Sequence, residues 1–119
     1  MSQKAERSDR DGKDALMEAI YEGNEQIVEA LISKGAEVNF QYSDGYFPIH
    51  KAVINNQVTI VEILLRKGAN IEAECETFSE TAICYAIRSG STEMVKTLLR
   101  NGAKFDRPNR RTGIYDLPN

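Results

Sequence analysis

A short phrase occurs three times in this chain, and its regular spacing limits the folds that the chain can adopt. The sequence LLRKGANIEAE begins at Leu64, LLRNGAKFDRP begins 34 residues later at Leu98, and LISKGAEVNFQ begins 33 residues earlier at Leu31. A period of this length indicates an array of small structural units, each of which buries its apolar side against its neighbours. A chain of 119 residues has room for three such units.

Each copy of the phrase follows an amphipathic pattern that predicts a helix. Apolar residues recur at positions i, i+1, i+4 and i+5, which places them on one side of a helix. They are Ile27, Val28, Leu31 and Ile32 in the first copy, Ile60, Val61, Leu64 and Leu65 in the second, and Met94, Val95, Leu98 and Leu99 in the third. The glycines that follow, Gly35, Gly68 and Gly102, are expected to end these helices in a left-handed conformation.

A shorter helix is expected before each of these, in DALMEAIYEG, FPIHKAVINN and TAICYAIRSG. Asp14 and Thr81 are suitable N-cap residues, and Pro48 suits the first helical position. Gly23 and Gly90 are expected to end the first and third short helices, where the second has Asn56. The segments between units predict extended connectors, with a tight turn at the Asp44–Gly45 pair.

The repeated unit of turn, short helix, longer helix and loop resembles the ankyrin repeat. The signature of that family is Thr-Pro-Leu-His-x-Ala, then a Val-x-x-Leu-Leu helix and Gly-Ala-Asp-Val-Asn; residues 47–52 read FPIHKA and residues 67–72 read KGANIE. The resemblance covers residues 9–117 and implies an all-α solenoid of stacked helix-turn-helix units joined by extended β-turn or hairpin connectors. We expect a flexible polar tail at 1–8, repeats at 9–41, 42–74 and 75–108, and a truncated fourth repeat or capping tail at 109–119.

The match departs from the family pattern at a few positions. Phe47 replaces the usual Thr, Met17 and Cys84 stand where the signature His belongs, and the connector before the third unit has one extra residue near Cys75. Two buried columns are expected along the stack, one formed by Leu16, Ile49 and Ile83 and the other by Ala36, Ala69 and Ala103. The third unit should expose its far side, unless Ile114, Tyr115 and Leu117 cover part of it.

The sequence contains no pattern typical of catalysis. The single histidine, His50, is expected to bond to nearby backbone, as the signature His does, because no Asp, Cys or Ser is placed to make it a base or metal ligand. No glycine-rich phosphate loop is present. We therefore expect no enzyme activity, no cofactor and no metal. Cys75 and Cys84 fit no metal spacing and are expected to be unpaired thiols, with a disulfide or redox pair as the alternative.

Charge and hydropathy narrow the class of partner. The net charge of −3 argues against nucleic acid, which binds mainly through Lys and Arg. The basic run Lys104, Arg107, Arg110 and Arg111 is interpreted as a solvated tail, with a patch for phosphate or an acidic partner as the alternative. No apolar run reaches the roughly 18 residues of a membrane span, and no secretory signal is evident. An intracellular, cytoplasmic protein is expected; the nucleus, a secreted bacterial effector and a viral protein stay open.

By resemblance, partners bind the connector tips and the exposed side of the short helices, on the concave face. Tyr21, Tyr46 and Phe78 are predicted to be exposed on this face, with Tyr42 close by; the alternative is that these rings lean back onto neighbouring units. Aromatic and Arg side chains are typical of interface hot spots. The predicted partner-binding residues are Tyr21, Glu22, Tyr42, Asp44, Tyr46, Ile54, Asn55, Phe78, Glu80 and Arg88.

The expected function is a non-catalytic protein–protein interaction module that acts as an adaptor or as an occluding inhibitor. The alternative is a structural segment of a longer solenoid, which continues or weakly self-associates through the open C-terminal face. Asn39, in GAEVN, lies where ankyrin asparagines can be hydroxylated, as implied by the resemblance alone. The other interpretation of Asn39 is a loop side chain that bonds to its own backbone.

Overall fold

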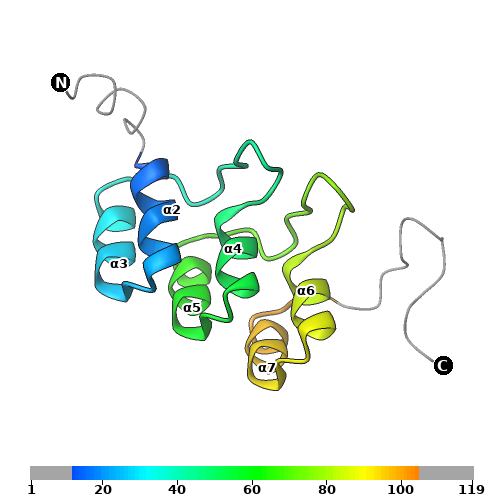
Figure 1. Ribbon diagram of the computed structural model, residues 1–119. Helices are drawn as coiled ribbons and strands as arrows, with labels where there is room; N and C mark the ends of the chain where they lie inside the picture. The colour runs from blue at the N-terminus through cyan, green and yellow to red at the C-terminus, as the bar shows by residue number, and fades with distance from the viewer. Residues whose placement is uncertain (1–11, 105–119) are drawn as a thin grey trace, which may run out of the picture.

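The computed structural model describes residues 12–104, which form six α-helices and no strand. The helices are α2 (Lys13–Glu22), α3 (Glu25–Ser33), α4 (Pro48–Ile54), α5 (Val58–Arg66), α6 (Ala82–Ser89) and α7 (Thr92–Arg100) (Figure 1). Several expectations lie outside the described residues: the tail at 1–8, the segment 109–119 with Ile114, Tyr115 and Leu117, and the basic residues Arg107, Arg110 and Arg111.

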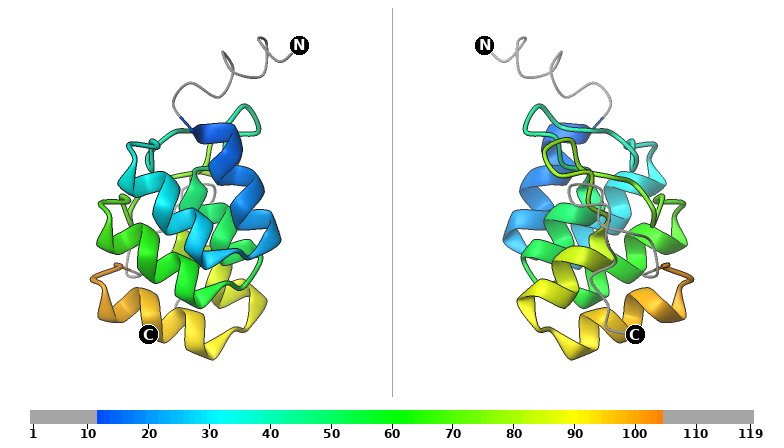
Figure 2. Two further views of the ribbon diagram at one scale, coloured as in Figure 1. Left: turned by 90° about the vertical axis from the view of Figure 1, so that its left-hand side faces the viewer. Right: turned by 90° about the vertical axis from the view of Figure 1, so that its right-hand side faces the viewer.

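The helices form two layers of three. Within each unit the short helix packs on the longer one, and along the stack α2, α4 and α6 form one layer while α3, α5 and α7 form the other. Figure 1 shows the pairs side by side with the connectors projecting beyond them, and Figure 2 shows the same two layers from both ends. The expected all-α fold of stacked helix-turn-helix units is confirmed.

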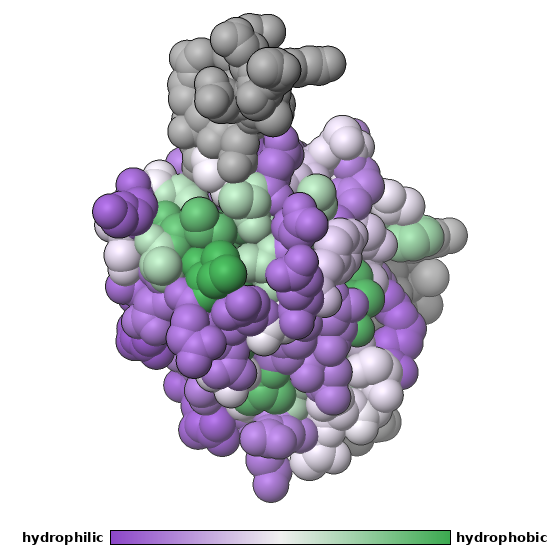
Figure 3. Space-filling model, turned by 60° about the vertical axis from the view of Figure 1, so that its left-hand side comes forward, coloured by the Kyte–Doolittle hydropathy of each residue, from purple (hydrophilic) through white to green (hydrophobic). Residues whose placement is uncertain are grey.

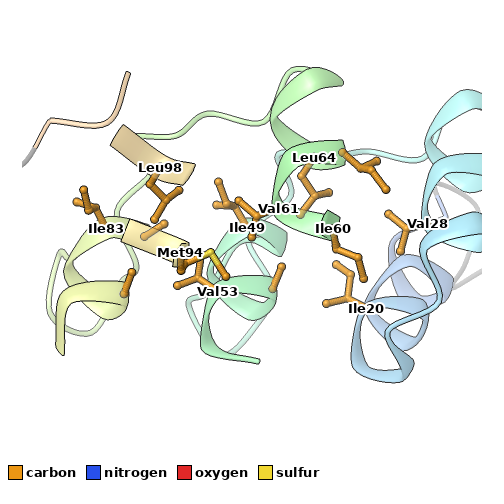
Figure 4. Close-up of a cluster of buried hydrophobic side chains, with 14 of the residues drawn as sticks. Ile20, Val28, Ile49, Val53, Ile60, Val61, Leu64, Ile83, Met94 and Leu98 are labelled. Carbon is orange, nitrogen blue, oxygen red and sulfur yellow. The ribbon is translucent and has the colours of Figure 1, made fainter. Parts of the chain in front are cut away.

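The core runs between the two layers through all three units. Leu16, Ile49 and Ile83 are each at most 1% exposed, so the predicted column exists. Figure 4 shows the side chains that fill the space between the layers, from Val28 in the first unit to Leu98 in the third. Of the second predicted column, Ala36 and Ala103 are buried and Ala69 is partly buried. Each unit therefore completes the core of its neighbour.

The helix ends follow the sequence signals with one exception. Gly23 and Gly90 end α2 and α6 in the left-handed conformation, with φ of 72° and 78°, and Asn56 adopts φ of 56° at the matching place. Pro48 begins α4, as expected. The prediction that Asp14 caps the first short helix is wrong, because Gly12 is the N-cap residue and Asp14 lies inside the first turn.

The connectors form hydrogen-bonded turns that also bond to each other. In the first, the Tyr42 amide donates to the Tyr46 carbonyl over 2.8 Å; in the second, the Cys75 amide donates to the Glu80 carbonyl over 2.9 Å. The second turn therefore holds the extra residue that the sequence placed near Cys75. The Glu76 amide also donates to the Gly45 carbonyl over 3.0 Å, which ties the second turn to the first.

His50, on α4, makes hydrogen bonds to the backbone of both connectors. Its Nδ1 accepts from the Phe47 amide at 3.1 Å, and its Nε2 lies 3.1 Å from the Glu80 carbonyl oxygen, which accepts a hydrogen bond when Nε2 is protonated. Burial favours the neutral ring and lowers the pKa of His50 below its usual 6.5, although the backbone bond to Glu80 opposes this. The predicted backbone-bonding role of His50 is confirmed.

Asn39 makes a different contact from the one expected. Its Nδ2 donates to the Gly68 carbonyl over 3.0 Å, and its Oδ1 accepts from the Asn70 amide at 2.8 Å. The expectation that it bonds to its own backbone is wrong, because the loop of the next unit lies within reach of its side chain. The amide group thus joins the loops of the first and second units.

The described residues leave apolar side chains exposed at both ends of the stack. Ile60 and Met94 are buried, whereas Ile27, their equivalent in the first unit, is 45% exposed. Figure 3 turns this end forward and shows an apolar patch within a hydrophilic surround. At the other end Ile87 is 47% exposed, whereas its equivalents Ile20 and Val53 are buried. At these two repeat positions, the apolar side chain is thus exposed in the unit at the end of the stack and buried in the other two units.

Candidate protein-binding surface

The outward side of α2, α4 and α6, together with the connectors 36–47 and 69–81, is called here the inner face. One repeat position projects from it in every unit, occupied by Tyr21, Ile54 and Arg88. Tyr21 is 58% and Ile54 49% exposed, and the Arg88 side chain is 56% exposed. Helical periodicity explains this, since these residues lie opposite the buried Leu16, Ile49 and Ile83. The inner face therefore presents a row of large side chains across three units.

A buried lysine links the first and second units beneath this row. The Lys51 side chain is only 5% exposed, and its Nζ donates to Asp44 Oδ2 over 2.7 Å and to the Tyr21 hydroxyl over 3.3 Å. The same ammonium lies 5.4–5.5 Å from the ring centres of Tyr21, Tyr42 and Tyr46. Aromatic faces attract a cation at this distance, so the rings and Asp44 together compensate for its burial.

The pKa values of the pair agree with this geometry. Burial alone would lower the pKa of Lys51, but the hydrogen bonds with Asp44 and the Tyr21 hydroxyl outweigh it and raise the pKa. Burial alone would raise the pKa of Asp44, but the hydrogen bonds from Lys51 and the Tyr46 amide outweigh it and lower the pKa. Both groups are therefore charged at neutral pH.

Aromatic contacts continue the row into the third unit. The rings of Tyr46 and Tyr85 lie 5.9 Å apart at an angle of 73°, and Tyr85 also lies 5.8 Å from the His50 ring. The guanidinium of Arg88 lies 5.1 Å from the Tyr85 ring centre and donates to both carboxylate oxygens of Glu80, over 2.6 and 2.8 Å. We call this continuous series, Tyr21, Lys51, Tyr46, Tyr85 and Arg88, the aromatic–cation ladder.

Seven of the ten predicted residues lie where the sequence suggested, exposed or bound into the ladder. Tyr21, Glu22, Ile54, Asn55 and Phe78 are exposed, with Phe78 at 42%, while Asp44 and Arg88 are exposed and ion-paired. Glu80 is partly buried against Arg88.

Two of the predicted partner-binding tyrosines are partly or largely buried. Tyr42, which was predicted to lie close to the exposed rings, is 7% exposed and donates its hydroxyl to the Lys13 carbonyl over 2.8 Å. The expected exposure of Tyr46 is wrong in degree, because the ring is partly buried between His50 and Tyr85. For these two rings the alternative, that they lean onto neighbouring units, describes the structure.

Sequence reasoning missed Lys51 and Tyr85, which carry the ladder between units. They occupy one repeat position, where the first unit has the exposed Glu18. Burial and the hydrogen bond with Cys75 Sγ, 3.0 Å away, raise the pKa of Tyr85, which keeps the hydroxyl neutral. The available signal was Lys51 itself, a basic residue in the largely apolar short helix PIHKAVI; no sequence signal related it to Tyr21, 30 residues earlier.

Among residues 12–104 no three His, Cys, Asp or Glu side chains lie together in a way that could hold a metal ion. A polar hollow of about 460 Å³ lies at the opposite end of the helices from the connectors, lined by residues that include Gly23, Glu25, Gln57 and Glu93. Within the same stretch, no helix combines the length and the apolar character needed to cross a membrane.

Comparison with known proteins agrees with the repeat pattern. Residues 16–109 match the family model described as ankyrin repeats (3 copies). The chain is 30% identical over 95 residues to the ankyrin repeat protein L371 of Acanthamoeba polyphaga mimivirus, which covers 80% of this chain and 12% of the relative. It is 29% identical over 97 residues to ankyrin repeat and SOCS box protein 2 of Homo sapiens, with 82% and 15% covered. The chain thus spans less than a sixth of the length of either relative.

Proposed function

Because this chain belongs to the ankyrin-repeat family, whose members generally mediate protein–protein interaction without catalysis, we propose that it binds a partner protein through its inner face. The observation that carries the proposal is the row of exposed side chains on a rigid support. Tyr21, Ile54 and Phe78 expose large apolar surfaces, while the ladder beneath holds adjacent units in register.

The physical argument is one of preorganisation. A binding surface gains affinity when its side chains are already ordered, because less conformational entropy is lost on association. Tyr21 is held by Lys51 and Arg88 by Glu80, so both lie ready in a defined geometry. Aromatic and Arg side chains of this kind supply most of the binding energy at protein interfaces.

In this proposal the module is an adaptor or an inhibitor that occludes its partner, and it has no catalytic role. One relative carries a SOCS box in its name beside its ankyrin repeats, which supports an adaptor role. The free thiols of Cys75 and Cys84 support a reducing, intracellular compartment. Within this proposal Asn39, an exposed loop residue, stays the candidate for hydroxylation.

The test is a capture experiment on lysate of the native source, with the immobilised chain as bait. The variant Ile54→Asp with Phe78→Asp removes two exposed apolar side chains from the inner face and its connector tip. The matched control, Ile27→Asp with Leu99→Asp, changes two residues of similar exposure that lie on the long helices. We expect a protein that the natural chain and the control retain and that the inner-face variant loses.

Unchanged helical circular dichroism in both variants is required for this comparison. Retention of the same proteins by both variants would contradict the inner face as the binding site. Loss of the partner only with the Ile27 and Leu99 changes would move the site to the ends of the stack.

A second candidate function is favoured by the exposed apolar residues of the third unit. Ile87 and Leu99, 47% and 40% exposed, support a structural segment that self-associates or continues a longer solenoid through this end. Sedimentation of the full chain over a range of concentrations tests this. Self-association that Ile87→Glu with Leu99→Glu abolishes would favour it, and a monomer at all concentrations would count against self-association.

A further inference from the structure

The two helix layers carry opposite charge balances. The inner face, comprising α2, α4, α6 and their connectors, has nine carboxylates and three basic side chains: Asp14, Glu18, Glu22, Glu37, Asp44, Glu72, Glu74, Glu76 and Glu80 against Lys13, Lys51 and Arg88. The layer of α3, α5 and α7 with the residues that end these helices has four carboxylates, Glu25, Glu29, Glu62 and Glu93, and five basic side chains, Lys34, Arg66, Lys67, Lys96 and Arg100. The small net charge of the whole chain conceals this separation.

All three basic side chains of the inner face are occupied by internal contacts. Lys51 is buried and paired with Asp44, and Arg88 is paired with Glu80 through two hydrogen bonds. The Lys13 ammonium lies 4.8 Å from the centre of the Phe40 ring. On the other layer, ion pairs instead link successive units, from Arg66 to Glu29 and from Arg100 to Glu62.

Three exposed carboxylates of the inner face, Glu18, Glu22 and Glu76, border exposed apolar side chains. Glu18 and Glu22 share one exposed stripe of α2 with Tyr21, because residues three or four apart lie on the same side of a helix. Glu76 is exposed in the same connector turn as Phe78. Among the described residues, no ion pair joins Glu18, Glu22 or Glu76 to a basic side chain. Negative charge and apolar surface therefore occur together.

We propose that the segment docked on the inner face is a basic stretch of another protein, rich in Lys or Arg and carrying at least one large apolar anchor. This rests on the proposed protein-binding function. Lys and Arg of the partner pair with Glu18, Glu22 and Glu76, while its anchor packs against Tyr21, Ile54 or Phe78. Complementary charge of this kind accelerates association and excludes acidic partners. A nucleic acid is excluded by the same charge, since its phosphates meet carboxylates.

The test uses short synthetic peptides of equal length as probes. The first contains several Lys and one Phe–Leu pair, the second has every Lys replaced by Glu, and the third keeps the Lys but has Ser for Phe and Leu. Fluorescence anisotropy measures binding to the full chain at low and at physiological ionic strength. We expect the first peptide to bind tightest, the third to bind more weakly and the second not to bind.

Two charge-matched variants locate the interaction. Glu22→Gln with Glu76→Gln removes two exposed carboxylates from the inner face, and Glu25→Gln with Glu93→Gln removes two from the other layer. We expect the inner-face pair to weaken binding of the first peptide by about three- to tenfold at low salt, and by less at physiological salt, where screening shortens the reach of exposed charges. The other pair changes binding by less than about twofold, the residual effect expected of distant screened charges.

Three outcomes would overturn the proposal. If both pairs of Glu→Gln changes weakened binding of the first peptide equally, the attraction would be diffuse and not located on the inner face. If the Glu peptide bound as tightly as the Lys peptide, charge would have no role in recognition. Salt-sensitive self-association of the natural chain, lost with the inner-face pair, would make a second copy the occupant.

A partner captured from lysate separates this inference from the proposed function. If that partner is lost with Ile54→Asp and Phe78→Asp but binds the Glu22 and Glu76 variant as tightly as the natural chain, the protein-binding function stands and the basic partner does not. If the partner is lost with the Ile54 and Phe78 changes and also binds the Glu22 and Glu76 variant more weakly, the protein-binding function and the basic partner are both supported.

Discussion

Lys51 connects side chains of the first and second units on the inner face. Its ammonium contacts a carboxylate of the connector and the rings of three tyrosines that come from two units. A buried cation without such partners would be strongly unfavourable. Removal of the ammonium takes from Asp44 its ion-pair partner and from Tyr21 its hydrogen bond to the second unit.

Replacement of Lys51 with Met tests this role, because Met keeps an unbranched side chain and removes the charge. We expect the free energy of unfolding to fall by about 1.5–3 kcal/mol, the usual worth of hydrogen bonds to a charged group. Urea denaturation measures it. The exposed Lys96 provides the control, since Lys96→Met should change stability by less than about 0.5 kcal/mol. Equal effects of the two changes would mean that the Lys51 contacts make no net contribution to the free energy of unfolding.

His50 predicts a pH dependence that can be assigned to one residue, because the chain has no other histidine. The pKa is lowered in the folded state, so the unfolded chain binds the proton more readily. Stability from the neutral ring is therefore complete above the ordinary pKa of 6.5 and is lost as the pH falls below it. We expect the melting temperature to fall between pH 6.5 and pH 5.

The variant His50→Gln separates this effect from general acid destabilisation. At neutral pH this variant should have a free energy of unfolding lower by about 1–3 kcal/mol, because the two hydrogen bonds of the ring are disturbed. Its melting temperature should no longer decline between pH 6.5 and pH 5. Persistence of the decline in the variant would assign the decline to other groups. The lowered pKa of Asp44 acts separately, because it withdraws stability only as the pH falls below about 3.8.

The sequence predicted residue positions better than residue contacts. His50 could be interpreted correctly because it occupies the histidine position of the family signature, although its partners Phe47 and Glu80 lie 3 and 30 residues away. Tyr42 and Asn39 could not, because their partners, the Lys13 carbonyl and the Gly68 carbonyl, lie 29 residues away and the signature indicates no contact for these side chains. The periodic pattern indicates that a position is on a connector or loop, but the distance between two stacked units decides whether its side chain reaches solvent or the neighbouring unit.

At the scale of elements, the helices were predictable because their signals are local. Apolar spacing, Pro48 and the glycines after five of the six described helices indicate where the helices lie without reference to the rest of the fold. The connectors were predictable only as turns. Their mutual hydrogen bond from Glu76 to Gly45 joins two segments that no local signal relates.

Gly45→Ala tests the contact between the connectors. Gly45 has φ of 89°, and an added Cβ would lie 2.8 Å from the Glu76 Cβ, too close without a shift of the second connector. We expect a loss of about 2–3 kcal/mol in the free energy of unfolding, from left-handed strain together with the displaced contact.

Gly68→Ala is the matched control, because Gly68 has φ of 103° and nothing within 4 Å of the added Cβ. Gly68→Ala should lower the free energy of unfolding by about 1–2 kcal/mol, from backbone strain alone. A Gly45 variant no less stable than the Gly68 variant would show that the connector contact contributes little. Urea denaturation of both variants measures the difference.

At the scale of the whole molecule, a residue's contribution to stability depends on which unit contains it. Ile27 and Ile60 occupy the same repeat position, but Ile60 is 1% exposed and Ile27 is 45% exposed. We expect Ile60→Ala to lower the free energy of unfolding by about 2–5 kcal/mol, because it leaves a cavity between units. Ile27→Ala should lower it by about 1 kcal/mol. Thermal or urea unfolding of the two variants checks this. Similar costs would mean that the α2 and α3 end of the stack is covered in solution.

The extra residue between Cys75 and Glu80 lengthens one turn, while the helices on either side remain stacked as their counterparts are. Ser79 absorbs it locally by adopting φ of 55°. Insertions at a turn tip can therefore reshape the surface that we propose meets a partner and leave the supporting core unaltered. A chain built in this way tolerates changes in turn length, and with them changes in its proposed recognition surface, without a change in how its helices pack.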